Sequence, residues 1–383
     1  MMSLFLQSEV KNPYSFYQKK IEENPLFWDE TNRIWAIYSY EHCIELLNNI
    51  NVHIPTLFPN NNLNKYASEI INNLARLSNG IHHEIAKETA VILFSYMKSI
   101  ETDTILKELL INESNLNHIN WVDLVCKKLP ILTILKGFDF DEKDSLLISN
   151  KISLLVKIMQ PFKTIEDVEL INNVSEEIYL ITKKHIAEHP VFEIIANKIS
   201  TSYSISSEET ISNCVCNLMG LFIQSYDATR GLLSNSLLQI LSSKNFYKNE
   251  FDKIWIQKMV TETLRFDPPI HNTRRIAIAD IRLNRVTIRK NDPILIVLAA
   301  ANRDPKQFEN PMNFDIDRDN NQEHLTFGKG GHMCLAKHFS VNLATDTLYY
   351  LLRNYNVSVL ENQIEYEPMI NARLPKAIWI SVL

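Results

Sequence analysis

The chain has 383 residues, of which 45% are hydrophobic and 22% charged, and its formal net charge is −6. This hydrophobic content is ordinary for a globular protein and excludes a chain that is mostly disordered. Both signs of charge are mixed and acidic residues are in excess, so nucleic acid is not an expected partner. MMSLFLQSEV lacks the charged start and apolar length of a signal peptide, and no membrane span is evident, so a cytoplasmic protein is expected.

The cysteines also favour the cytoplasm. An odd number scattered over a long chain is typical of reduced thiols rather than of disulfides. The cysteines are Cys43, Cys126, Cys214, Cys216 and Cys334. Because Cys214 and Cys216 are two residues apart, they point to different sides of a helix, and both are interpreted as core thiols.

The first two thirds of the chain read mostly as helix. RIWAIYSYEHCIELLNN predicts a strand followed by an amphipathic helix, and residues 54–68, rich in Pro and Asn, predict a long loop. From 69 to 265, apolar residues recur at spacings of three and four, which predicts helices. Prolines near the expected helix boundaries are Pro130, Pro161 and Pro190.

Alternation replaces the helical pattern after Pro269. RRIAIADIRLNRVTIRKNDPILIVL predicts a small antiparallel sheet with turns at Asn284 and Asn291, where asparagine tolerates left-handed backbone. A helix after Cys334 to about Arg353 and two last strands, NVSVLENQIEYEP and KAIWISVL, complete the chain. The prediction is one domain over 1–383, mainly α with a small β region.

LTFGKGGHMCLAKH concentrates three of the 7 glycines just before Cys334. Glycine permits positive φ and close approach of the backbone to a bulky group. A cysteine at a helix start faces unpaired N–H groups and the positive end of the helix dipole, which favour the metal-ligating thiolate. No Cys or His partner stands at zinc spacing, so haem iron is the leading candidate. The alternative is a buried cysteine after a tight turn.

FGKGGHMCLA resembles the haem-binding signature of the cytochrome P450 family. The signature positions are filled by Phe327, Gly330, His332 and Cys334, with Gly328 between them. Ala336 replaces the glycine that most members have, and AANRDP at 300–305 is a further match in family order. The resemblance covers essentially the whole chain. It implies the cytochrome P450 fold, a helical haem-binding domain with minor antiparallel sheets, no fused reductase, and haem b bound by Cys334.

TETLRFDPP places Glu262 and Arg265 on one helical face. Alone, such a pair is more often a weak surface ion pair. It resembles the family's Glu-x-x-Arg motif, to which a later arginine, here Arg318, is added. The resemblance implies a partly buried network that holds the scaffold beneath the haem.

The resemblance also implies residues that bind the haem propionates, which need cationic or hydrogen-bonding partners. The expected partners are His83, Lys87, Arg275 and His324. His82 is a rival for His83 because the two are adjacent in NGIHHEIAK. Each of these residues also has an ordinary interpretation as an exposed charge or a hydrogen-bonded histidine.

The segment 216–241 is apolar at both ends and polar in its middle. In a buried helix, such polar side chains need hydrogen-bond partners or have a functional role. The family's distal helix carries an acid followed by a threonine that organises proton delivery. Asp227 matches the acid, but Ala228 stands in place of the threonine. Asp227 also has a structural alternative, an ion pair with Arg230 three residues on.

Without that hydroxyl, proton delivery needs another group. The chain offers Gln224, Ser225 and Thr229, besides ordered water or a substrate hydroxyl. Thr229 lies about 100° further round the helix than Ala228, which makes it a poor direct replacement.

Three functions remain open at this point. The first is a soluble bacterial-type monooxygenase of secondary metabolism, acting on a small, polar, natural-product-type substrate. The second is a haem-thiolate enzyme of oxidative coupling, dehydration or peroxide-driven oxidation. The third is a non-enzymatic haem-binding or sensor protein.

The resemblance also implies where substrate and electron donor bind. Substrate contacts are expected from His271, Asn272 and Leu218, together with the polar middle of the distal helix. The expected electron donor is a ferredoxin-type protein with its reductase. Cations beside the cysteine that would attract this acidic partner are Lys329, Lys337 and His338. A monomer is expected.

Overall fold

The computed structural model describes residues 3–56, 62–160, 163–243, 251–361 and 363–383. The chain divides into two compact units. The first unit comprises Met1–His53, Thr102–Lys127 and Asp227–Leu383, and the second comprises Ile54–Glu101 and Lys128–Tyr226. The described residues are mainly helical with small sheets, as the sequence predicts.

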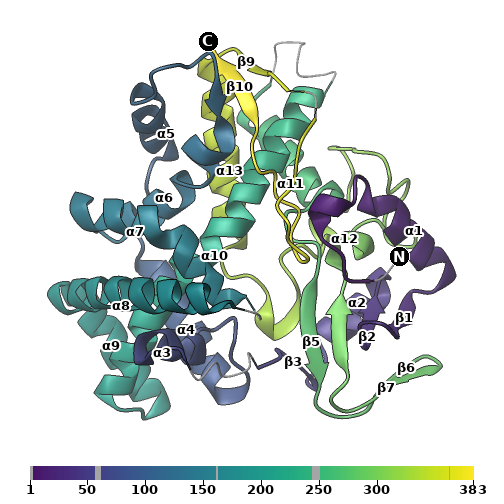
Figure 1. Ribbon diagram of the computed structural model, residues 1–383, viewed down its shortest axis with the longest axis horizontal. Coiled ribbons are helices and arrows are strands. Elements are labelled where there is room, and N and C mark those ends of the chain that lie inside the picture. The colour runs from purple at the N-terminus through teal and green to yellow at the C-terminus, as the bar shows by residue number, and fades with distance from the viewer. Residues whose placement is uncertain (1–2, 57–61, 161–162, 244–250, 362) are drawn as a thin grey trace. The chain divides into compact units, whose positions relative to one another are not determined.

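All the strands assigned in the described residues belong to the first unit, where they form three sheets. The strands are β1 (Leu26–Asp29), β2 (Ile34–Ile37), β3 (Val52–His53), β4 (Ile119–Asn120), β5 (Thr273–Ala277), β6 (Ile281–Leu283), β7 (Val286–Ile288), β8 (Pro293–Ile296), β9 (Val357–Val359) and β10 (Trp379–Val382). The largest sheet has the order β1-β2-β8-β5-β3, and the second has the order β4-β10-β9. The third is the β6–β7 hairpin (Figure 1).

One pairing in the largest sheet corrects the expectation of purely antiparallel sheets. β2 and β8 run parallel, with Trp35 opposite Ile294 and Ile37 opposite Ile296, whereas the other pairs are antiparallel. Parallel strands need a long connection. Here the connection is most of the chain, so the local alternation of the sequence could not reveal the pairing.

The largest sheet is covered on both faces because its side chains alternate along each strand. Ile37, Ile294 and Ile296 enter one core cluster, in which the buried face of helix α2 (Tyr40–Leu47) also takes part. On the other face, Ala36 and Leu295 enter a second cluster with helix α1 (Pro13–Glu23). The strand and helix predicted from RIWAIYSYEHCIELLNN are thus confirmed as β2 and α2.

The asparagine turns predicted in this region are also confirmed. Asn284 joins β6 to β7 with φ +50°, and Asn291 precedes β8 with φ +72°. These are left-handed conformations that asparagine adopts more readily than other non-glycine residues. In a chain with 7 glycines, asparagine takes the turn positions that glycine commonly fills.

Helices complete the first unit. They are α1, α2, α5 (Thr102–Ile111), α11 (Lys253–Phe266), α12 (Leu298–Ala301) and α13 (Lys337–Asn354), with the short helical turns η1 (Gln7–Glu9), η2 (Val122–Cys126), η5 (Asn321–Glu323) and η6 (Gly330–His332). α11 packs against α13, and both are crucial to the candidate site because one carries the glutamate–arginine pair and the other follows the cysteine loop.

The second unit is built from helices alone in its described residues. They are α3 (Lys65–Asn73), α4 (Gly80–Tyr96), α6 (Leu129–Gly137), α7 (Glu142–Leu155), α8 (Ile165–Glu188) and α9 (Pro190–Tyr203), with the turn η3 (Val156–Met159). Pro130 and Pro190 stand in the first turns of α6 and α9, where proline is tolerated, as predicted. Pro161 lies outside the described residues.

The predicted loop at 54–68 is too long at its C-terminal end. Asn64 caps α3 by accepting a hydrogen bond from the main-chain N–H of Ala67, so residues 65–68 are helical. The asparagine run that indicated a loop therefore includes a helix cap, since asparagine favours both settings.

α10 (Ser207–Ser242) is continuous, and the division between the two units falls within it, between Tyr226 and Asp227. Its N-terminal half carries Cys214 and Cys216, which are 1% and 0% exposed, so the prediction of two core thiols is confirmed. Burial raises the pKa of the Cys214 thiol to about 12.

Candidate active site

The cysteine loop is held by hydrogen bonds within its own backbone. The main-chain N–H of Cys334 donates to the carbonyl of Phe327 at 2.8 Å, and that of Gly328 donates to Leu325 at 2.8 Å. The turn η6 (Gly330–His332) lies between Gly328 and Cys334 in the chain. Cys334 therefore has a defined backbone position that the first unit itself provides.

The predicted helix start at Cys334 needs a correction. α13 begins at Lys337, three residues later, with Ala336 as its N-cap. The unpaired N–H groups of the helix start thus lie further along the chain than expected. Ala336 has φ −87°, a conformation that alanine adopts without strain, so the missing family glycine leaves the backbone undisturbed.

Two of the three loop glycines meet a conformational requirement. Gly328 has φ +71° and Gly330 has φ +68°. A Cβ added to Gly330 would also lie 2.5 Å from the Leu47 carbonyl oxygen of α2, which is closer than atoms can approach. At Gly331 an added Cβ would meet nothing within 4 Å. The glycine cluster is therefore required at its first two positions.

These two neighbouring glycines make a matched test of the loop. Gly330→Ala is expected to destabilise the protein by about 1–3 kcal/mol, because it combines left-handed strain with a clash against backbone. Gly331→Ala should leave the unfolding midpoint nearly unchanged. Denaturant unfolding of both variants checks this, and equal midpoints would contradict the strained geometry.

Cys334 is the exposed thiol among cysteines that are otherwise buried. Burial raises the pKa of Cys43, Cys126, Cys214 and Cys216 well above the ordinary thiol value, which keeps them protonated. Metal ligation requires a thiolate that the metal can reach. Cys334 is accessible, and the four other cysteines are protonated and enclosed.

His324 is buried beside the cysteine loop and has a defined tautomer. The main-chain N–H of Thr326 donates to its Nδ1 at 3.2 Å, so a neutral ring carries its proton on Nε2. Burial lowers the pKa of His324 to about 3, aided by Lys337 and Arg265. The ring therefore presents a neutral N–H donor at Nε2, which is suited to a carboxylate.

The other predicted propionate partners lie in both units. Arg275, on β5, is 7% exposed and donates from Nη1 to Thr273 Oγ1 and to the carbonyl of Arg274. In the second unit, His83 is half-buried on α4 and its Nδ1 contacts the Ala75 carbonyl at 2.8 Å. Lys87 lies one turn later and is half-buried as well, whereas His82 is exposed. The half-buried pair on one face is thus His83 with Lys87.

The loop's remaining signature residues are partly exposed. Phe327 is half-buried, with its ring 5.5 Å from that of His324, and His332 is half-buried within η6. The residues of the first unit fit a haem: an accessible thiol, a neutral imidazole donor, a guanidinium and open space at Gly331 are all present. No rearrangement of the loop backbone is needed to expose the thiol.

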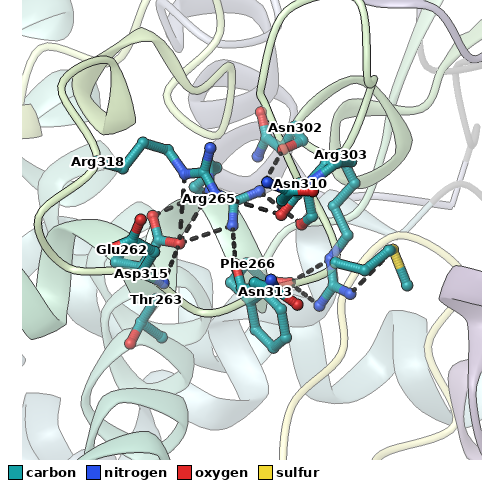
Figure 2. A network of polar contacts seen from close by, with 12 residues as sticks. Glu262, Thr263, Arg265, Phe266, Asn302, Arg303, Asn310, Asn313, Asp315 and Arg318 are labelled. Carbon is teal, nitrogen blue, oxygen red and sulfur yellow. Dashed lines mark hydrogen bonds and ion pairs between the residues drawn. The ribbon is translucent and has the colours of Figure 1, made fainter.

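The glutamate–arginine pair forms the centre of a buried network (Figure 2). Glu262 and Arg265 are both 0% exposed, and the Arg265 Nε lies 3.1 and 3.0 Å from the two carboxylate oxygens. Arg265 also donates to the carbonyls of Asn302, Pro311 and Asn313. The guanidinium therefore binds Glu262 within α11 and also joins α11 to the end of α12 and the irregular segment after it.

Arg318 is the second arginine expected to bind Glu262, but it approaches the carboxylate less closely than Arg265 does. Its Nε is 3.8 Å from Glu262 Oε1, a distance too long for a hydrogen bond. Its Nη1 and Nη2 donate to the carbonyls of Glu309 and Asn310. Arg318 thus contributes its charge to Glu262 and its hydrogen bonds to the neighbouring loop.

Asn302 links the same network to the cysteine loop. Its Oδ1 accepts from the main-chain N–H of Leu325 at 2.6 Å, and its Nδ2 donates to Thr326 Oγ1 at 2.9 Å. Asn302 lies in the AANRDP motif, which predicts no role for its side chain. The motif alone does not predict the hydrogen bonds of the Asn302 amide to Leu325 and Thr326.

The polar middle of α10 presents its groups on different sides of the helix. Gln224 is exposed, while Ser225 and Ala228 are half-buried, and these three share one face at helical spacing. Thr229 is 3% exposed and faces the interior. Gln224 Nε2 donates to the Gly220 carbonyl, and Ser225 Oγ donates to that of Phe222.

Asp227 is held in the ion pair that the sequence offered as its structural alternative. Arg230 Nη2 lies 3.1 Å from Asp227 Oδ1, and Arg230 Nη1 lies 3.5 Å from Glu367 Oε1. Arg230 is almost fully buried. Glu367, in the segment between β9 and β10, is a partner that no sequence pattern indicates.

Three of the residues predicted to contact substrate, His271, Asn272 and Leu218, are buried. His271 is 0% exposed, with Nδ1 3.1 Å from the Tyr17 hydroxyl and Nε2 3.4 Å from that of Tyr14. Asn272 donates to the Ile370 carbonyl at 2.9 Å, and Leu218 is 0% exposed in α10. Within its own unit, each contributes to the protein interior.

Comparison with known proteins supports a single family. Residues 252–377 match the family model of cytochrome P450. The biotin biosynthesis cytochrome P450 of Bacillus subtilis (strain 168) is 35% identical over 173 residues, which span 44% of this chain and 42% of that relative. Cytochrome P450(BM-1) of Priestia megaterium is 24% identical over 349 residues, 85% of this chain and 82% of that protein.

A solved structure extends the similarity to the fold. P450BioI, in complex with an acyl carrier protein ligated to hexadec-9Z-enoic acid, has a TM-score of 0.81 at 23% identity and covers 97% of this chain and 99% of that one. Among the described residues, no helix is long and apolar enough to cross a membrane. Sequence matches from Glu262 through the cysteine loop and a shared fold lead to one conclusion: the chain is similar to cytochrome P450s, which are oxidoreductases of the monooxygenase class.

Proposed function

We propose that the protein is a haem-thiolate monooxygenase in which Cys334 binds haem b and a small organic substrate of natural-product type is oxidised. The observation that carries the proposal is the accessible Cys334 on a loop whose backbone is fixed by its own hydrogen bonds. When bound through a thiolate, haem supplies dioxygen activation driven by electron donation from sulfur. His324 and Arg275 would hold its propionates, and His83 and Lys87 stay predicted as further propionate partners.

Glu262, Arg265 and Arg318 would have a structural role in this enzyme. Their contacts join α11 to the segment that leads into the cysteine loop. Buried charge pairs with satisfied hydrogen bonds fix one arrangement of the chain. We therefore assign them to holding the loop rather than to chemistry.

Proton delivery in this chain has to work without a hydroxyl at Ala228. Gln224 and Ser225 lie on the same face and retain side-chain oxygens, which can hydrogen-bond to water or to a substrate hydroxyl. Asp227 is held beside Arg230 in an ion pair. We propose that the Asp227 carboxylate orients the groups that deliver protons. Gln224 and Ser225 would be the groups of this path nearest to the bound substrate.

Restoring the hydroxyl tests this assignment. Ala228→Thr is expected to change the amount of product formed per NADPH consumed, because positioned proton donors contribute about 10²–10⁴-fold to such steps. Ala228→Val has nearly the same shape without the hydroxyl and is the matched control. If threonine and valine give the same ratio of product to NADPH, proton delivery does not depend on this position.

The reaction type can be separated by the source of oxidant. Substrate-dependent NADPH consumption with a supplied ferredoxin and reductase supports the monooxygenase. Turnover with hydrogen peroxide alone would favour peroxide-driven oxidation, coupling or dehydration. An iron that stays six-coordinate and exchanges no distal ligand would instead indicate a haem-binding or sensor protein.

Cations around the cysteine loop support a ferredoxin-type donor. Lys329 and His338 are exposed, and Lys337 is half-buried at the start of α13. Such a cluster would steer an acidic partner toward the thiolate side. We further propose a monomer that works in the cytoplasm, where cysteine thiols stay reduced.

A second substrate class is favoured by the relatives. One carries the name biotin biosynthesis cytochrome P450, and P450BioI was solved with an acyl carrier protein ligated to a fatty acid. We propose a carrier-linked acyl chain as the alternative to a polar natural product. Soret shifts on titration with fatty acids, acyl carrier protein conjugates and polar natural products would separate the two classes.

A further inference from the structure

A cavity of about 240 Å³ lies in the first unit, lined by residues outside the candidate active site. Its walls come from the start of α1, the C-terminal ends of α10 and α11, the segment after α12 and the segment before β10. Its charged lining residues are Lys11, Asp267, Arg303 and Arg373. Pockets for drug-sized ligands measure about 300–1,000 Å³, so this one suits a smaller molecule.

Two of these cations are almost fully buried. Arg303 is 6% exposed and lies between two aromatic rings, with its guanidinium carbon 3.6 Å from the ring centroid of Tyr14 and 3.7 Å from that of Phe266. Arg373 is 5% exposed and lies 3.5 Å from the ring centroid of Tyr366. Ring stacking fixes both guanidinium planes at the cavity wall.

Their hydrogen bonds to described residues all go to neutral atoms. Arg303 donates from Nε and Nη2 to the Phe266 carbonyl, and its Nη1 lies 3.7 Å from the Met312 sulfur. Arg373 donates to the carbonyls of Gln7, Val10 and Lys11. Carbonyls satisfy some N–H groups, but they do not neutralise two buried charges, which proteins ordinarily pair with an anion.

The lining holds one carboxylate, Asp267, whose negative charge acts on Arg303. Asp267 Oδ1 accepts the Tyr14 hydroxyl hydrogen bond at 2.6 Å. Three cations therefore line the cavity against one carboxylate. The N-terminus of α1, capped by the Asn12 side chain, also borders the cavity and adds the positive end of a helix dipole.

We propose that this cavity binds a small oxyanion, a phosphate or a carboxylate, between Arg303 and Arg373. Planar guanidinium groups recognise both anions through paired N–H donors, and the stacked rings hold these donors in place. Arg303 directly follows Asn302, whose side chain holds Leu325 and Thr326 at the base of the cysteine loop. Binding therefore stabilises the folded holoenzyme through that segment.

Calorimetric titration of the holoenzyme with inorganic phosphate and with benzoate, at constant ionic strength, tests the proposal. Saturable binding of either anion is expected, together with an upward shift of the thermal unfolding midpoint that sodium chloride does not produce. Binding of phosphate alone identifies a phosphoryl ligand, and binding of benzoate alone identifies a carboxylate. If neither binds saturably, or chloride gives the same shift, the proposal is wrong.

A charge variant on the cavity wall locates the binding. Gln239 is a half-buried lining residue of α10, and Gln239→Glu adds a negative charge without removing a buried cation. We expect it to weaken anion binding about tenfold or more. Gln257→Glu makes the same charge change at an exposed position of α11 outside the cavity and should bind as the wild type does. Equal weakening in both variants, or none in Gln239→Glu, would place the anion elsewhere.

Discussion

Replacing Cys334 by serine is expected to abolish the red-shifted Soret band that thiolate-ligated haem shows when the protein is reduced and bound to CO. Serine keeps the size of the side chain but cannot supply a thiolate at neutral pH. The loop backbone should persist, because its hydrogen bonds use main-chain groups of Cys334 and Phe327. Absorption spectra of the reduced, CO-bound variant measure the effect directly.

Cys214→Ala provides the matched control for this experiment. Cys214 is buried in α10, and burial raises the pKa of its thiol to about 12, so it cannot act as the ligand. The control should keep the red-shifted band. A wild-type band that is not red-shifted, or a Cys334→Ser variant that retains the shift, would contradict thiolate ligation by this residue.

Arg265→Ala is expected to destabilise the protein by about 3–5 kcal/mol, because it leaves the Glu262 carboxylate buried without its partner. It also leaves three carbonyl groups of the adjoining segment without their donor. A loss of this size is a large fraction of the stability of a typical protein. Chemical denaturation of purified holoprotein measures it.

An exposed ion pair on the same helix shows whether burial is the cause. Lys258, also on α11, lies 2.6 Å from Asp317, and both side chains are largely exposed. Lys258→Ala removes a charge pair with the same shortest N–O distance of 2.6 Å and should leave the unfolding midpoint close to that of the wild type. If the two variants unfold alike, the buried network does not stabilise the fold as inferred.

Local patterns predicted much of this fold because the interactions that produce them are local. Alternation and turn chemistry indicated β2, the β6–β7 hairpin and the left-handed asparagines at 284 and 291. The parallel pairing of β2 with β8 left no such trace. It joins Trp35 to Ile294 across most of the chain, and register at that distance is set by tertiary packing.

The same distinction explains the candidate site. Motif spacing placed Phe327, Gly330 and Cys334 on one loop, since these residues are neighbours in sequence. Partners from distant segments could not be read that way. Glu367 reaches Arg230 across 137 residues, and Tyr14 reaches His271 across 257. The tyrosine partners of His271 are therefore a finding of the structure, and its contact with substrate stays a prediction.

The close approach of Gly330 to the Leu47 carbonyl has a consequence for cofactor affinity. The loop packs against α2 through contacts that the polypeptide makes without the cofactor. Ordering a residue of flexible backbone costs about 1–2 kcal/mol in conformational entropy. Here the loop is ordered during folding, so haem binding involves no further entropic cost for ordering it. The apoprotein is therefore preorganised for its cofactor.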